Sequence, residues 1–206
     1  MSKGKTPPIS VRNTARIFRE MVSLRRYYCA DSDFFRMDEF WEWLADTDDS
    51  IGIRLSNAPV TGQEKSKVKA GVVAVGEKST LVAPRDMFQK AKAGSLLHNF
   101  VLAHEFGHLA LEHHASRTKI INYQLDSSDG QLANIPPNLL ELEANYAAVF
   151  FQCGVELFNT SISELELAKR ASSDPFYVGK AKAICRLEAF QNELRFLQNR
   201  YERVVL

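Results

Sequence analysis

Two histidines, His104 and His108, stand four residues apart within a segment, Ser95 to His114, whose apolar residues recur at the spacing of a helix. Residues four apart on a helix project from the same face, so both imidazole rings can reach one metal ion. The histidines share a stripe with three apolar residues, Leu97, Val101 and Leu111. Two unpartnered histidines in a buried stripe would be costly, and a metal ion would satisfy both. The segment therefore predicts a metal-binding helix with Ser95 as its N-cap.

Two residues between the histidines extend this interpretation. Glu105 is rotated by about 100° from His104, which can leave its carboxylate beside the metal rather than bound to it. That position suits a general base that takes a proton from the attacking water. Gly107 costs roughly 1 kcal/mol relative to alanine in a helix interior. Close approach of another backbone near the metal would account for a glycine at this position.

The His-Glu-x-x-His pattern is short, so it needs support from elsewhere in the chain. With five histidines and fifteen glutamates in 206 residues, it arises by chance in about one chain in a hundred. A zinc peptidase requires a third protein ligand and an open fourth position for water. The helical segment 138–153 offers two carboxylates for that third position, Glu141 and Glu143.

Glu141 is the better placed of the two carboxylates. It shares a helix face with small residues that would let the two helices lie close together, namely Ala144, Asn145 and Ala148. Glu143 points about 200° away from Glu141. We therefore predict Glu141 as the third ligand, with its ligand atom about 3–4 Å from those of the histidines. Asn145, one turn on, could orient a histidine, and Glu143 is expected to partner nearby polar groups.

The remaining pattern predicts an α+β fold. Three short segments are rich in strand-forming residues, 51–55, 68–75 and 80–83. Helical spacing marks the segments 10–29, 37–45, 95–114, 138–153, 161–171 and the residues from Pro175 onward. We expect a small, mostly antiparallel three-stranded sheet packed on the metal-binding helices, with additional N- and C-terminal helices. Residues 1–9 are expected to form a flexible tail, and 10–206 a single domain with a helical extension from about 155 to 206.

Composition and charge limit the classes of partner. A formal net charge of +1 provides no whole-protein field for nucleic acid or an anionic membrane, and the arginines of the segment 10–29 are expected to form a solvated helix face. No stretch reaches the roughly 20 apolar residues that a membrane span needs, and the N-terminus lacks the apolar run of a secretory signal. Three widely spaced cysteines indicate neither a disulfide framework nor a cysteine zinc site. A cytoplasmic protein is expected.

Two stretches together resemble the ImmA/IrrE family of metallo-endopeptidases: Asn99-Phe-Val-Leu-Ala leading into His104-Glu-Phe-Gly-His108, and Glu141-Leu-Glu-Ala-Asn145. The resemblance covers about residues 70–150 and implies a zincin-like helical core. It implies that His104, His108 and Glu141 bind zinc and that Glu105 is catalytic. The chain departs from the family where Phe150-Phe-Gln-Cys-Gly154 replaces a Leu-Leu-Met-Pro type ending, and its N-terminal helix is too short for the helix-turn-helix domain that many members carry.

The expected function is zinc-dependent hydrolysis of peptide bonds. The resemblance implies site-specific cleavage of a cytoplasmic, repressor-type transcriptional regulator. The alternative is a zinc-containing regulatory protein that sequesters a partner without cleaving it. The donor for the oxyanion stays open among Tyr123, Tyr146 and Tyr177, and the long polar segment 115–138 is the expected docking surface. The other histidines, His98, His113 and His114, are expected to lie outside the site.

Overall fold

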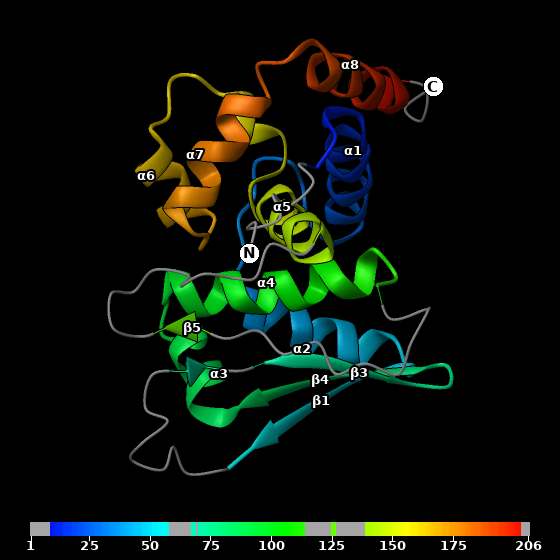
Figure 1. Cartoon of the computed structure of the whole chain (residues 1–206), viewed down its shortest axis with the longest axis vertical. Helices are drawn as coiled ribbons and strands as arrows, with labels where there is room; N and C mark the ends of the chain where they lie inside the picture. Colours follow the sequence, from blue (N-terminus) through cyan, green and yellow to red (C-terminus); the bar gives the residue numbers. More distant parts are fainter. Residues whose placement is uncertain (1–8, 58–66, 69, 114–124, 127–138, 203–206) are drawn as a thin grey trace, which may run out of the picture.

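The computed structural model describes residues 9–57, 67–68, 70–113, 125–126 and 139–202. Two layers meet along one central helix, α4 (Leu96–Ala110), as Figure 1 shows. On one side of α4 lie the sheet and two helices, α2 (Met37–Thr47) and α3 (Arg85–Lys92). On the other side lie the remaining helices, which are α1 (Val11–Tyr28), α5 (Leu139–Cys153), the 3-10 helix η1 (Gly154–Phe158), α6 (Glu164–Arg170), α7 (Pro175–Ile184) and α8 (Glu188–Glu202). The predicted α+β class is confirmed.

The main sheet has three strands in the order β1-β4-β3. Strands β3 (Gly71–Val75) and β4 (Lys78–Pro84) pair antiparallel across a two-residue turn, in which Gly76 takes a positive φ of 61°. β1 (Ile51–Ser56) runs parallel to β4. The sheet is therefore mixed rather than mostly antiparallel, because the alternation of residues in a strand does not specify the direction of its partner.

A second, two-stranded sheet pairs β2 (Lys67–Val68) with β5 (Leu125–Asp126) in antiparallel fashion. The segment predicted as one strand, 68–75, is thus divided between two sheets. Within the part of the chain that the structure describes, no helix is both long enough and apolar enough to cross a bilayer.

Asn99 and Trp41 fix α4 to the layer of the sheet. The Asn99 side chain is fully buried, and its Oδ1 accepts a hydrogen bond from the Met37 amide at 2.8 Å. Its Nδ2 donates to the carbonyls of Ala91 and Ser95 at 2.9 and 3.0 Å. Trp41 Nε1 donates to the carbonyl of Leu102 at 3.0 Å. These side-chain bonds tie α2 and α3 to α4, so they hold the orientation of the helix that carries both histidines.

Arg25 of α1 binds the C-terminal end of α5. The expectation that the arginines of this segment form a solvated helix face is therefore wrong for Arg25. The residue is fully buried. Its Nη1 donates to the carbonyls of Phe151 and Gln152, each at 3.2 Å, and its Nη2 donates to the carbonyl of Asp33. A guanidinium suits this place because the last carbonyls of a helix lack partners within the helix and carry partial negative charge.

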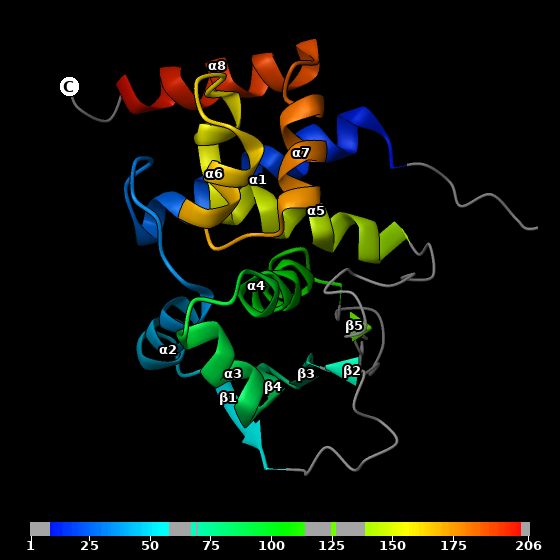
Figure 2. The ribbon, with the colours of Figure 1, turned by 90° about the vertical axis from the view of Figure 1, so that its left-hand side faces the viewer.

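Helices α4 and α5 approach each other closely at Gly107. A Cβ at this position would lie 2.8 Å from the carbonyl oxygen of Ala144 and 3.1 Å from the Cβ of Ala147. Figure 2 shows the two helices crossing at this level, with α4 seen nearly end-on beneath α5. The expected close backbone approach at Gly107 is therefore present, and its partner is the face of α5 that carries Ala144. This contact sets the separation of the helices that carry the predicted ligands.

Replacing Gly107 with alanine should lower the free energy of unfolding. The added methyl group would press on a backbone carbonyl, and overpacking of this kind costs about 1–3 kcal/mol, against a gain of about 1 kcal/mol in helix propensity. Because the 2.8 Å contact is with backbone, we expect a cost in the upper half of that range and therefore a net loss of roughly 1–2 kcal/mol in urea denaturation. Gly52→Ala in β1 is the matched control, because its Cβ would meet only the Thr80 side chain at 3.5 Å. Equal stability of the Gly107→Ala variant and the native chain would contradict this account of the packing.

Candidate metal centre

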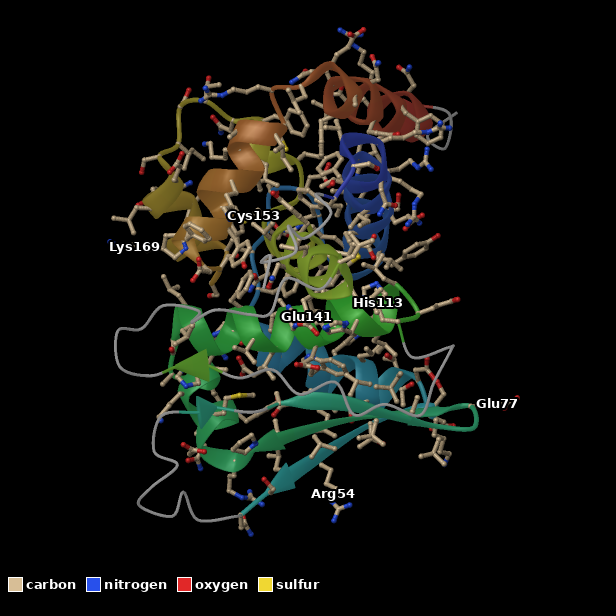
Figure 3. All side chains as sticks on the ribbon, viewed as in Figure 1. Arg54, Glu77, His113, Glu141, Cys153 and Lys169 are labelled. Carbon is tan, nitrogen blue, oxygen red and sulfur yellow. The ribbon has the colours of Figure 1, made fainter. Side chains whose placement is uncertain are left out.

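Three predicted ligands converge between α4 and α5. The Nε2 atoms of His104 and His108 lie 3.0 Å apart. Oε2 of Glu141, from the first turn of α5, lies 3.1 Å from the first of these atoms and 3.5 Å from the second. Both histidines are fully buried, and the side chain of Glu141 is 12% exposed. Figure 3 shows Glu141 directed from α5 toward α4.

These distances and atom types fit a metal ion. Four ligands at the usual Zn–N and Zn–O distances in a tetrahedron lie about 3.3 Å from one another. The three donor atoms all lie within 4.8 Å of one another, and the individual separations of 3.0–3.5 Å bracket the tetrahedral value. Imidazole nitrogen and carboxylate oxygen are ligands that Zn²⁺ accepts readily. The three residues could therefore hold one metal ion.

The surroundings of His108 and Glu141 favour the protonation states that metal binding needs. Burial lowers the pKa of His108, and the neighbouring His104 lowers it further, although contact with Glu141 opposes this. Burial opposes ionisation of Glu141, but hydrogen bonds and charge from the two histidines outweigh burial and hold the pKa of this carboxyl well below its usual range. A neutral imidazole and an ionised carboxylate are the ligand forms of these side chains.

Asn145 contacts the outer side of one histidine ring. Its Oδ1 lies 3.0 Å from Nδ1 of His104, and both residues are fully buried. An Nδ1–H that donates to this oxygen leaves the Nε2 lone pair facing Glu141 and His108. The orienting contact that we predicted for Asn145 is therefore present in the geometry.

His113 lies closer to the predicted metal ligands than the sequence indicates. Its Nδ1 is 2.8 Å from Nδ1 of His108, and its Nε2 is 3.2 Å from Oε2 of Glu143. The expectation that α4 extends to His114 missed this arrangement, because the helix ends at Ala110 and the chain folds back. Glu143 has the polar partners that we expected of it, since Nδ2 of Asn13 in α1 donates to its other oxygen.

Glu105 is enclosed without a normal hydrogen-bond partner. The residue is fully buried, and among the residues that the structure describes neither carboxylate oxygen has a hydrogen bond of ordinary geometry. Burial raises the pKa of Glu105 well above its usual value, and the charge of Glu141 raises it further. The backbone amide of Val72, in the edge strand β3, opposes the rise. A carboxylate of this kind accepts a proton readily.

Two of the three tyrosines considered as oxyanion donors, Tyr146 and Tyr177, lie in the described part of the chain. The aromatic ring of Tyr177 stacks on Phe100 of α4 at 5.0 Å between centroids. Burial raises the pKa of Tyr177 to about 12, with the charges of Asp174, Tyr146 and Glu141 as further causes. Tyr146 stacks instead on Phe150. Nδ1 of His98 bonds to the Ser95 hydroxyl at 2.7 Å, at the opposite end of α4. Tyr123, His114 and all of the segment 115–138 except β5 fall outside the described residues.

Comparison of the chain with protein-family models, curated proteins and solved structures finds no match. The support for the candidate metal centre is therefore the convergence of His104, His108 and Glu141.

Replacing Glu105 with glutamine should stabilise the metal-free chain at neutral pH. Since the folded-state pKa of this carboxyl is raised, its contribution to stability is complete below the ordinary value of 4.5 and is lost as the pH rises toward the folded value. The amide stays neutral, so the stability difference between Glu105→Gln and the native chain should be large at neutral pH and shrink below pH 4.5. Thermal unfolding in the presence of a chelator measures this difference.

Glu77→Gln provides the control for that comparison. Glu77 is an exposed carboxylate in the turn between β3 and β4, remote from Glu141 (Figure 3). Its replacement should leave the pH dependence of unfolding as it is in the native chain. The same pH profile in Glu105→Gln and Glu77→Gln would show that the buried carboxylate carries no such penalty.

Proposed function

We propose that this chain is a zinc-dependent endopeptidase of the ImmA/IrrE type. The observation that carries the proposal is the convergence of His104, His108 and Glu141 around one point, next to the buried carboxylate of Glu105, whose oxygens have no hydrogen bond of ordinary geometry among the described residues. A structural zinc site has four protein ligands and no use for a base. Three candidate ligands with Glu105 beside them match the requirements of a hydrolytic site instead.

The chemistry divides between the metal and the protein. When bound, zinc would polarise the scissile carbonyl and lower the pKa of water to about 7. His104, His108 and Glu141 would hold the ion, and Asn145 would keep the His104 ring in its ligating orientation. Glu105 would accept the proton of the attacking water at a carboxylate oxygen and pass it to the leaving amine. Burial raises the pKa of Glu105, and a raised pKa favours uptake of that proton.

The edge of the main sheet is an argument for a polypeptide substrate. β3 is an edge strand of the main sheet. The backbone amide of Val72, within β3, lies near the carboxylate of Glu105 and lowers its pKa, against the larger effect of burial. An extended peptide that adds to a strand edge forms backbone hydrogen bonds along its length. A peptide added at this edge would run past the proposed base, which favours cleavage within a chain over removal of a terminal residue.

The proposed substrate is a cytoplasmic regulatory protein of the repressor type, as the resemblance to the family implies. A protease that works in the cytoplasm must discriminate strongly between proteins. Its activity is therefore expected to depend on docking of a specific partner and to be weak on unstructured substrates such as casein.

Metal analysis tests the first part of the proposal. Purified chain should contain about one zinc ion, and alanine at His104, His108 or Glu141 should remove it because each of these residues supplies a ligand atom. Glu105→Gln should retain zinc, since this side chain serves as base rather than ligand. Loss of zinc in Glu143→Ala together with its retention in Glu141→Ala would reverse the assignment of the third ligand.

Co-expression with candidate regulators tests the second part. Native chain should cleave its partner at one or a few sites, and Glu105→Gln should slow cleavage by about 10²–10⁴-fold while keeping the metal. Cleavage at the native rate in Glu105→Gln would exclude the proposed base, and rapid digestion of casein would exclude restricted specificity. Tight binding of a partner without cleavage at any zinc concentration would favour a regulatory protein that sequesters its partner.

A further inference from the structure

We propose that His113 and Glu143 act as a positioning pair for the metal ligand His108. Neither residue reaches the metal position itself. The pair contacts the outer nitrogen of the His108 ring, and we infer that it fixes both the orientation of that ring and the nitrogen that carries its proton. This inference rests on the proposed metal site and adds two residues to it.

The direction of each hydrogen bond follows from the geometry. Nε2 of His108 faces His104 and Glu141, so binding a metal there requires a lone pair on Nε2 and the proton on Nδ1. That proton points to Nδ1 of His113 at 2.8 Å, which must then accept it. The proton of His113 consequently lies on Nε2, 3.2 Å from the carboxylate of Glu143. These protonation states fit the contacts of His108 with His113 and of His113 with Glu143, and they are the states in which Nε2 of His108 can ligate.

The backbone conformation at the end of α4 is consistent with a positioning role for His113. The amide of Glu112 donates to the carbonyl of Leu109, and the amide of His113 donates to that of His108, each at 3.1 Å. This bonding pattern turns the chain back on the helix and usually has glycine at the left-handed position. Here Glu112 occupies that position with a φ of 53°. A non-glycine residue in this conformation is strained, and the turn brings the imidazole of His113 against that of His108.

The carboxylate of the pair is itself held by α1. Asn13 donates from Nδ2 to one oxygen of Glu143, which leaves the other oxygen for His113. Oδ1 of Asn13 accepts hydrogen bonds from Arg16 at 2.9 and 3.2 Å, so the amide cannot present its oxygen to Glu143 without losing these bonds. The side chains of His113 and Glu143 are only 6% and 12% exposed. A chain of oriented polar groups therefore runs from α1 to the metal ligand.

The competing explanation is that the pair only ties α4 to α5. Zinc affinity distinguishes the two explanations. Loss of a purely structural contact lowers the stability of the fold, whereas loss of a positioning pair also weakens zinc binding, because the His108 ring is no longer held in its ligating orientation. We expect His113→Ala to weaken zinc binding by about 10–100-fold, measured by competition with a chromophoric chelator. His113→Gln should recover part of this loss, since its amide oxygen can accept the proton of His108. Glu143→Gln should fall between native and His113→Ala, because it keeps an acceptor and loses the charge.

His98→Ala is the matched control, since His98 is a half-buried histidine of the same helix whose ring bonds to Ser95. Its zinc affinity should equal that of the native chain. In the zinc-loaded native chain, NMR should detect a slowly exchanging Nδ1 proton on His108, and this signal should be lost in His113→Ala. Thermal unfolding of each metal-free variant measures the purely structural contribution.

The outcomes separate the two proposals. A native chain that binds no zinc would overturn the metal site and this inference together. If the native chain binds zinc while His113→Ala binds it equally well, the positioning role is excluded and the proposed function stands. A lowered unfolding temperature of metal-free His113→Ala with unchanged zinc affinity would likewise leave the pair as a structural tie only.

Discussion

The contact of Gly107 with the backbone of Ala144 is the constraint on which the site depends. Helices pack at separations set by the side chains between them, and here one side chain is missing on α4 and the facing residues on α5 are alanines. The approach brings the carboxylate of Glu141 within 3.5 Å of both imidazoles. With larger residues at this crossing, the same three ligands on the same helices would be too far apart to share one ion.

The electrostatics of the site explain why a metal ion suits it. Two buried imidazoles and two buried or partly buried carboxylates lie together, and one carboxylate lacks a normal hydrogen bond among the described residues. Burial raises the pKa of Glu105 and the charge of Glu141 raises it further, and a divalent cation at the centre would offset the repulsion between the two carboxylates. The same arrangement that destabilises the metal-free fold would supply a base of suitable strength, as is common where catalytic groups are tuned by burial.

Local features of the sequence predicted the parts of the structure that depend on local geometry. The spacing of His104 and His108 and the face of Glu141 follow from helical periodicity, and the cost of a glycine in a helix pointed to the crossing at Gly107. The parallel pairing of β1 with β4 is a long-range choice that no residue in either strand encodes by itself.

Two other features were also beyond the reach of local patterns. Arg25 was expected on a solvated face because its neighbours are charged, but the free carbonyls at the end of α5 draw it into the core. His113 was missed because the fold-back at Glu112 uses a residue other than the usual glycine. The carbonyls that bind Arg25 lie more than a hundred residues away in the sequence. The position of His113 depends on the strained backbone conformation of Glu112.

The ligands are divided between the two layers, and this division has a mechanical consequence. His104 and His108 belong to the half of the molecule that contains the sheet, and Glu141 belongs to the helical half (Figure 2). An ion bound to all three would add a cross-link between two halves that already touch at the crossing of α4 with α5 and through aromatic pairs such as Phe40–Phe151 and Phe100–Tyr177. Metal loading would then restrain the angle between α4 and α5, and with it the position of the sheet relative to the helical layer.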